Sequence, residues 1–174
     1  MLNTTTPADV PGDTADQHFR DLVLLRRMLL YTKKDDEYLQ LAAPVINASS
    51  AQIMHAWYDY ISADPYLSNY FKPGTAEEFA HSRFSDWLQQ LCNRGGLRQW
   101  EALEKQVPEN AGPLKPLQPE LLRYLTAFAF PVIQAGNEAL HAAGMDAPTL
   151  ANVKQAWFKA VTLSIALWAY PNKN

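Results

Sequence analysis

Residues 153–171 read VKQAWFKAVTLSIALWAYP, a run in which apolar residues recur at helical spacing on two faces. One stripe is small or apolar: Val153, Trp157, Ala160, Ser164 and Leu167. The second is larger: Phe158, Val161, Ile165 and Trp168. A helix that is apolar on two faces is buried on both. One face can pack on the core of the chain, and we expect a two-fold partner copy to cover the other. The alternative is that earlier helices of the same chain cover both faces.

A second long helix precedes this one and is also unusually apolar. It is expected from about Pro119, a favoured first-turn residue, to Ala143. Residues 124–133 within it carry no charged side chain. The last helix is expected to start near Asp146 and to end before Pro171. We therefore expect a homodimer through these two helices, with these residues at its centre: Phe128, Trp157, Ile165 and Trp168.

The remainder of the chain is also predicted to be helical, with a first helix over residues 17–31. Capping boxes, in which a hydroxyl residue is followed three positions later by an acid or amide, predict three more helix starts. They are Thr32 with Asp35, Ser49 with Gln52 and Thr75 with Glu78. Pro44 is expected to bend or shorten the helix that begins at Thr32.

Stop signals divide these helices from one another. Asp64-Pro65 ends the third helix, because the residue before proline avoids the helical region. Residues 93–96 read NRGG and end the fourth, as glycine often does. Residues 97–106 form a short helix at best. Residues 107–119 hold four prolines and are expected to be a loop.

Composition indicates one globular domain that is all-α. The chain has 174 residues, of which 48% are hydrophobic, and a net charge of −3. We interpret residues 1–16 as a mobile arm, 17–171 as the domain and 172–174 as a tail. The single cysteine, Cys92, excludes an intrachain disulfide. With no signal peptide, no membrane span and no Lys/Arg cluster interleaved with aromatics, we expect a cytoplasmic protein without a nucleic-acid or membrane partner.

Four separated segments resemble the protoglobin family, the single-domain globins related to globin-coupled sensors. They are residues 56–71 (AWYDYISADPYLSNYF), 83–87 (RFSDW), 123–131 (RYLTAFAFP) and 155–171 (QAWFKAVTLSIALWAYP). The last is the most specific, since it is long and rich in tryptophan. The resemblance covers about residues 15–171 and implies a globin fold with an extra helix before the globin core. It also implies a homodimer through the last two helices, and a distal pocket lined by Trp57, Tyr58 and Phe84.

The residue that holds haem iron in a globin has no counterpart in this sequence. That ligand is normally a proximal histidine between the E and G helices. The corresponding interval here, residues 95–118, contains no histidine, cysteine, methionine or tyrosine. Of the four histidines, only His81 has a spacing from Phe84 that could place it on the pocket side, as an alternative axial ligand. We expect no metal site and no bound cofactor, with haem as the alternative.

Two functions remain open at this stage. The first is a haem-free protoglobin-like domain that acts as a sensor or binding module. It would bind a small apolar ligand in an apolar pocket, or a separate signalling protein at its surface. The second is a globin that binds oxygen or another diatomic gas on haem with an unusual axial ligand. An enzyme is not expected, since no nucleophile, general base or phosphate-binding loop stands in a recognisable pattern.

Overall fold

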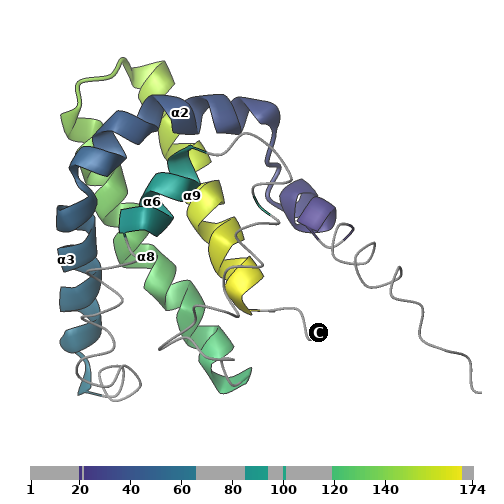
Figure 1. Ribbon diagram of the computed structural model, residues 1–174, viewed down its shortest axis with the longest axis vertical. Coiled ribbons are helices and arrows are strands. Elements are labelled where there is room, and N and C mark those ends of the chain that lie inside the picture. Colours follow the sequence, from purple (N-terminus) through teal and green to yellow (C-terminus); the bar gives the residue numbers. More distant parts are fainter. Residues whose placement is uncertain (1–19, 21, 66–84, 94–99, 101–118, 170–174) are drawn as a thin grey trace, which may run out of the picture.

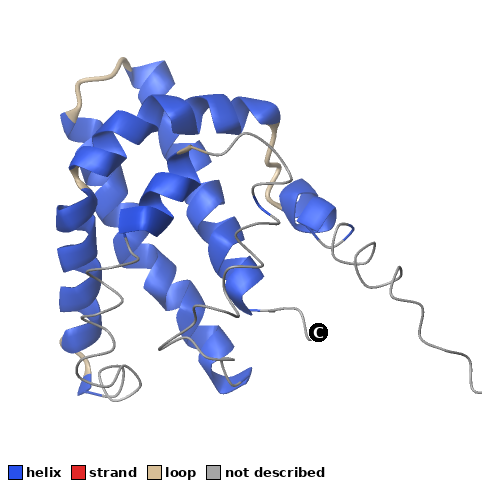
Figure 2. Cartoon of the chain, in the orientation of Figure 1, coloured by secondary structure: helices blue, strands red, loops and turns tan. Residues whose placement is uncertain are grey.

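The chain folds as a bundle of helices, seen in a computed structural model that describes residues 20, 22–65, 85–93, 100 and 119–169. Residues 22–28 are helical and precede five longer helices. These are α2 (Lys33–Ala48), α3 (Ser50–Ser62), α6 (Ser85–Cys92), α8 (Pro119–Ala142) and α9 (Ala147–Ala169). The described residues contain no strand, so the prediction of an all-α domain is confirmed (Figure 2).

The two closing helices form the frame on which the others pack. The helix pair α8 and α9 is antiparallel, with α2 lying across its upper end and α3 beside α8 (Figure 1). Helix α6 packs chiefly against α2 and also touches α3 and α9. The core lies where these helices meet, and its largest fully buried side chains include Leu39, Ile46, Ile53, Leu88, Leu91, Trp100, Leu140, Trp157 and Leu163.

Local capping explains where α2 begins. Thr32 is extended, with φ −122° and ψ 172°, and its backbone N–H donates to Asp35 Oδ2 at 2.6 Å. The Thr32 hydroxyl donates to the same oxygen at 3.0 Å. The predicted capping box is therefore confirmed. Pro44 was expected to bend or shorten this helix, and it does not shorten it, because α2 continues through Pro44 to Ala48. Pro44 is exposed, so the carbonyl that loses its N–H partner can be solvated.

The ends of the other described helices also follow sequence signals. Ser49 precedes α3, and its carbonyl accepts the N–H of Ile53 at 2.9 Å, as an N-terminal capping residue does. Helix α3 ends at Ser62, before Pro65, as predicted. Asp146 Oδ1 accepts the N–H of Thr149 at 3.0 Å and starts α9. The predictions for residues 1–19, 66–84, 97–99, 101–118 and 170–174 lie outside the described residues.

Both apolar faces of α9 are largely covered by the chain itself, which corrects the expectation that a partner must cover one of them. Trp157 is fully buried against α8, and Val161 and Ile165 of the second stripe are 0% and 6% exposed. Helices α2, α6 and α8 all contact α9. Trp157 and Ile165 are therefore not available to a second copy. Only Phe158 of the second stripe, at 49% exposed, reaches solvent among the residues whose side chains are described.

Candidate functional site

Two of the three residues expected in the distal pocket can be placed, and they do not share one environment. Trp57 of α3 is 6% exposed and joins the core. Tyr58, the next residue, is 36% exposed. Successive residues of an α-helix point about 100° apart, and here only the first of the two rings is buried. The exposure of Tyr58 argues against its lining an enclosed pocket. Phe84 lies outside the described residues.

The environments of the described histidines and of the cysteine bear on whether they could bind haem iron. His55 on α3 and His141 at the end of α8 are both exposed. Cys92 is fully buried, and burial raises the pKa of its thiol to about 12, so the thiolate that would bind iron is disfavoured. No group of three or more His, Cys, Asp and Glu in this part of the chain could hold a metal ion. His81, the alternative ligand named from the sequence, and His18 lie outside the described residues.

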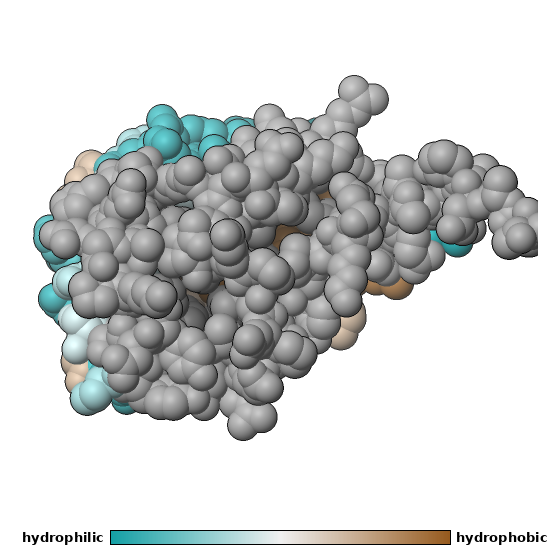
Figure 3. Space-filling model, turned by 60° about the horizontal axis from the view of Figure 1, so that its bottom comes forward, coloured by the Kyte–Doolittle hydropathy of each residue, from teal (hydrophilic) through white to brown (hydrophobic). Residues whose placement is uncertain are grey.

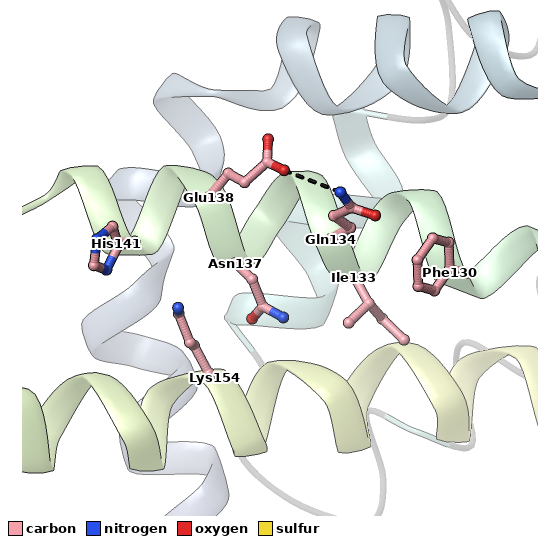
Figure 4. A pocket seen from close by; sticks show the side chains of 7 residues that line it. All are labelled: Phe130, Ile133, Gln134, Asn137, Glu138, His141 and Lys154. Atoms are coloured by element: carbon pink, nitrogen blue, oxygen red, sulfur yellow. Dashed lines mark hydrogen bonds between the residues drawn. The ribbon is translucent and has the colours of Figure 1, made fainter.

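An open groove runs along the outer side of α8, beside α9, with a volume of about 620 Å³. Phe130 and Ile133 form its apolar half, and Asn137 and His141 continue the same face of α8 toward its C-terminus (Figure 4). Lys154 projects from α9 toward them. Gln134 and Glu138 also line the groove, and the Gln134 amide donates to Glu138 Oε1 at 3.2 Å. The groove thus combines an apolar floor with one cation and one carboxylate.

A close approach of the two helices lies next to this groove. A Cβ added to Gly136 would lie 2.3 Å from Trp157 Nε1 and 2.6 Å from its Cε2. Only glycine therefore lets the α8 backbone rest on the indole ring. Within the described part of the chain, neither Trp157 Nε1 nor Asn137 Oδ1 has a hydrogen-bond partner, although both atoms are buried. By contrast, the Trp87 indole N–H of α6 donates to Ser164 Oγ of α9 at 2.8 Å.

A buried ionic contact fixes the other side of α9. Lys159 Nζ donates to Asp35 Oδ1 of α2 at 2.9 Å and to the carbonyl oxygen of Leu30 at 2.9 Å. The side chains of Lys159 and Asp35 are only 11% and 8% exposed. A charge this poorly solvated must be paired and hydrogen-bonded to be tolerated. Lys159 therefore ties α9 both to the start of α2 and to the turn before it.

A second polar cluster surrounds Tyr31 in that turn. The Tyr31 hydroxyl donates to Asp36 Oδ1 at 2.7 Å, and the Arg26 guanidinium lies 4.7 Å from the Tyr31 ring centroid. Trp100 packs edge-on against the ring, with centroids 5.7 Å apart. Burial, reinforced by the bond to Asp36, raises the pKa of Tyr31. Burial also raises the pKa of Asp36, against the opposing effects of the Tyr31 hydroxyl and Arg26.

Sequence reasoning did not find these polar contacts. Lys159 and Asp35 are separated by 124 residues, and Asp35 was explained fully by its capping role. One signal was available: Lys159 is the only charged residue between Gln155 and Tyr170, a segment otherwise suited to burial. A lone charge in such a segment requires a buried counter-charge.

The family follows from these features and from comparison with known proteins. The family model for Protoglobin matches residues 20–172. The chain therefore belongs to the Protoglobin family and is a globin-like domain, consistent with the all-helical fold described above. No curated protein gave a significant match. Among the described residues, no helix has both the length and the apolar character that a membrane span requires.

Proposed function

We propose that this protoglobin-like domain senses or binds without haem, and that it acts through surfaces and apolar cavities of the protein itself. Family membership supports a globin-like sensor domain. The ligand chemistry supports the absence of haem, because the interval that should hold the proximal histidine contains none, and the only two histidines that the structure describes are exposed. The absence of histidine from residues 95–118 is the observation that carries the proposal.

Titration with haem tests this proposal directly. The purified chain is mixed with haem, desalted and examined for a Soret absorption band, beside His81→Ala and His55→Ala. We expect no band to survive desalting in any of the three proteins, because residues 95–118 contain no histidine and both described histidines are exposed. A band that survives in the natural chain and in His55→Ala, but is lost in His81→Ala, would overturn the proposal. It would establish instead a gas-binding globin with a non-standard axial ligand, which family membership favours as the second candidate.

We also propose that two copies of the domain associate through the groove on α8 and α9. Phe130 and Phe158 are 60% and 49% exposed on these helices, which is unusual for residues of their size. Glu138 and Lys154 line the same groove with opposite charges. In a two-fold dimer the same patch faces itself, so the lysine of one copy can approach the carboxylate of the other. This revises the residues expected at the interface, since Trp157 and Ile165 are buried within one chain.

Light scattering coupled to gel filtration measures this association. The measured molar mass should be twice the 19.6 kDa of one chain, and Phe130→Asp should convert the dimer to a monomer. Leu41→Asp is the matched control, since Leu41 is also an exposed apolar residue, 55% exposed, but lies on α2. A monomeric natural chain, or equal dimer content in the two variants, would contradict association through the groove.

A further inference from the structure

Three large apolar side chains face solvent near the N-terminal end of the described chain. Leu24 is 53% exposed, Met28 is 81% exposed and Leu30 is 74% exposed. Leu24 and Met28 are four residues apart and share one face of the helix over residues 22–28. That helix lies at the edge of the bundle (Figure 1). In Figure 3, hydrophobic surface is visible at the corresponding edge of the molecule. These side chains are therefore not explained by packing within the core.

Leu30 is exposed and also has a strained backbone conformation. Its φ is +51°, a region that glycine adopts readily and a leucine rarely does. The N–H of Tyr31 bonds to the carbonyl of Arg26 at 2.8 Å, and that of Leu30 to the carbonyl of Arg27 at 3.0 Å. This is a Schellman motif with leucine where glycine is usual. The motif itself requires a positive φ at this position, and Lys159 bonds the Leu30 carbonyl, but neither contact involves the exposed leucine side chain.

Basic residues are frequent in the sequence next to the three apolar ones. Residues 20–34 hold five Lys and Arg but only one acid, Asp21, in a chain whose net charge is −3. Of the acids that follow, Asp35 and Asp36 are buried and bonded to Lys159 and Tyr31, whereas Arg27, Lys33 and Lys34 are exposed residues. Lys33 and Lys34 also occupy the first turn of α2, where the helix dipole disfavours cations. The local excess of positive charge points to an anionic partner.

We propose that this basic apolar face binds the surface of an anionic lipid membrane. The face is defined by Leu24, Met28 and Leu30 with Arg27, Lys33 and Lys34. Protruding apolar side chains flanked by cations suit the interface between lipid headgroups and acyl chains, where the cations meet lipid phosphates and carboxylates. The composition of the whole chain predicts no membrane partner, because its net negative charge conceals this local excess.

Sedimentation with lipid vesicles tests the proposal on the full chain. Vesicles of phosphatidylcholine are compared with vesicles containing about 30% phosphatidylserine, at low and at high salt. We expect binding only to the anionic vesicles, and a marked loss of binding at high salt. Arg27→Gln with Lys33→Gln should weaken the partition coefficient about 25-fold, since each cation near such a surface contributes about fivefold. Met28→Ser should weaken it by about tenfold.

A matched control separates this face from general hydrophobicity. Leu41→Ser changes an exposed leucine on α2, outside the groove, and should leave vesicle binding unchanged. Circular dichroism confirms that each variant keeps its helices. Absence of binding to anionic vesicles, or equal weakening by the control, would overturn the proposal. If Met28→Ser instead alters self-association and not vesicle binding, the face contacts a second copy and the membrane proposal is wrong.

Discussion

Helix α9 is held from two sides by contacts of opposite kinds, only two residues apart. At Trp157 the contact with α8 is steric, and it depends on the absence of any side chain at Gly136. At Lys159 the contact with α2 is ionic, and it depends on a charge that is almost completely removed from water. An added side-chain atom at Gly136 would disrupt the first contact, and loss of the Lys159 charge would disrupt the second. The position of α9 is therefore specified twice, by shape on one side and by charge on the other.

The largest effect on stability is expected from removing the charge of Lys159. Lys159→Met keeps much of the side-chain volume but leaves Asp35 as a buried carboxylate without its counter-charge. We expect the free energy of unfolding to fall by about 3 kcal/mol, measured by urea denaturation. Lys154→Met, on the same helix but in the open groove, should change it by less than about 0.5 kcal/mol. Equal effects of the two substitutions would show that the buried pair does not position α9.

The steric contact at Gly136 should be disrupted by the addition of a single methyl group. In most helices Gly→Ala raises stability by about 0.5–1 kcal/mol. Gly136→Ala should instead lower the free energy of unfolding by about 2 kcal/mol, because the new methyl group overlaps the Trp157 ring. In a Trp157→Phe background the same change should cost less, since phenylalanine lacks the indole atoms nearest to Gly136. A stabilising effect of Gly136→Ala in the natural chain would contradict the close approach.

The polar cluster around Tyr31, near the ionic contact, should make the free energy of unfolding depend on pH. Its pKa is raised in the folded state above the ordinary value of 10.0, chiefly by burial. The folded state therefore favours the neutral phenol, and stability should be fully present below pH 10.0 and fall as the pH rises above it. Tyr31→Phe should cost about 1–2 kcal/mol at neutral pH, since Asp36 loses its donor. It should also reduce the fall above pH 10.0, and an unchanged alkaline slope would refute this assignment.

The smallest effect is expected at the turn that Lys159 holds through the carbonyl of Leu30. Leu30→Gly relieves the strain of a positive φ, so we expect the free energy of unfolding to rise by up to about 1 kcal/mol. Thermal or urea unfolding measures this rise. Leu24→Gly, within the preceding helix, should be destabilising by a similar amount. A loss of stability in Leu30→Gly would mean that the exposed leucine makes contacts that stabilise the fold.

Local sequence signals predicted the helices well. Thr32, Pro119 and Asp146 mark helix starts because capping depends on a few neighbouring residues. The covering of the second face of α9 could not be predicted, because it depends on which distant helices reach it. The same holds for the pairing of Lys159 with Asp35 and for the exposure of Tyr58. The absence of histidine from residues 95–118 can be seen in the sequence alone, because it requires only the order of residues along the chain.

The haem content of the protein made in haem-supplemented cells tests the central claim most directly. The ratio of haem to chain can be measured from the absorption of the pyridine haem complex after purification. We predict a ratio close to zero, because the interval between the E and G helices has no side chain suited to iron. A ratio approaching one haem per chain, with a Soret band lost in His81→Ala, would contradict this account.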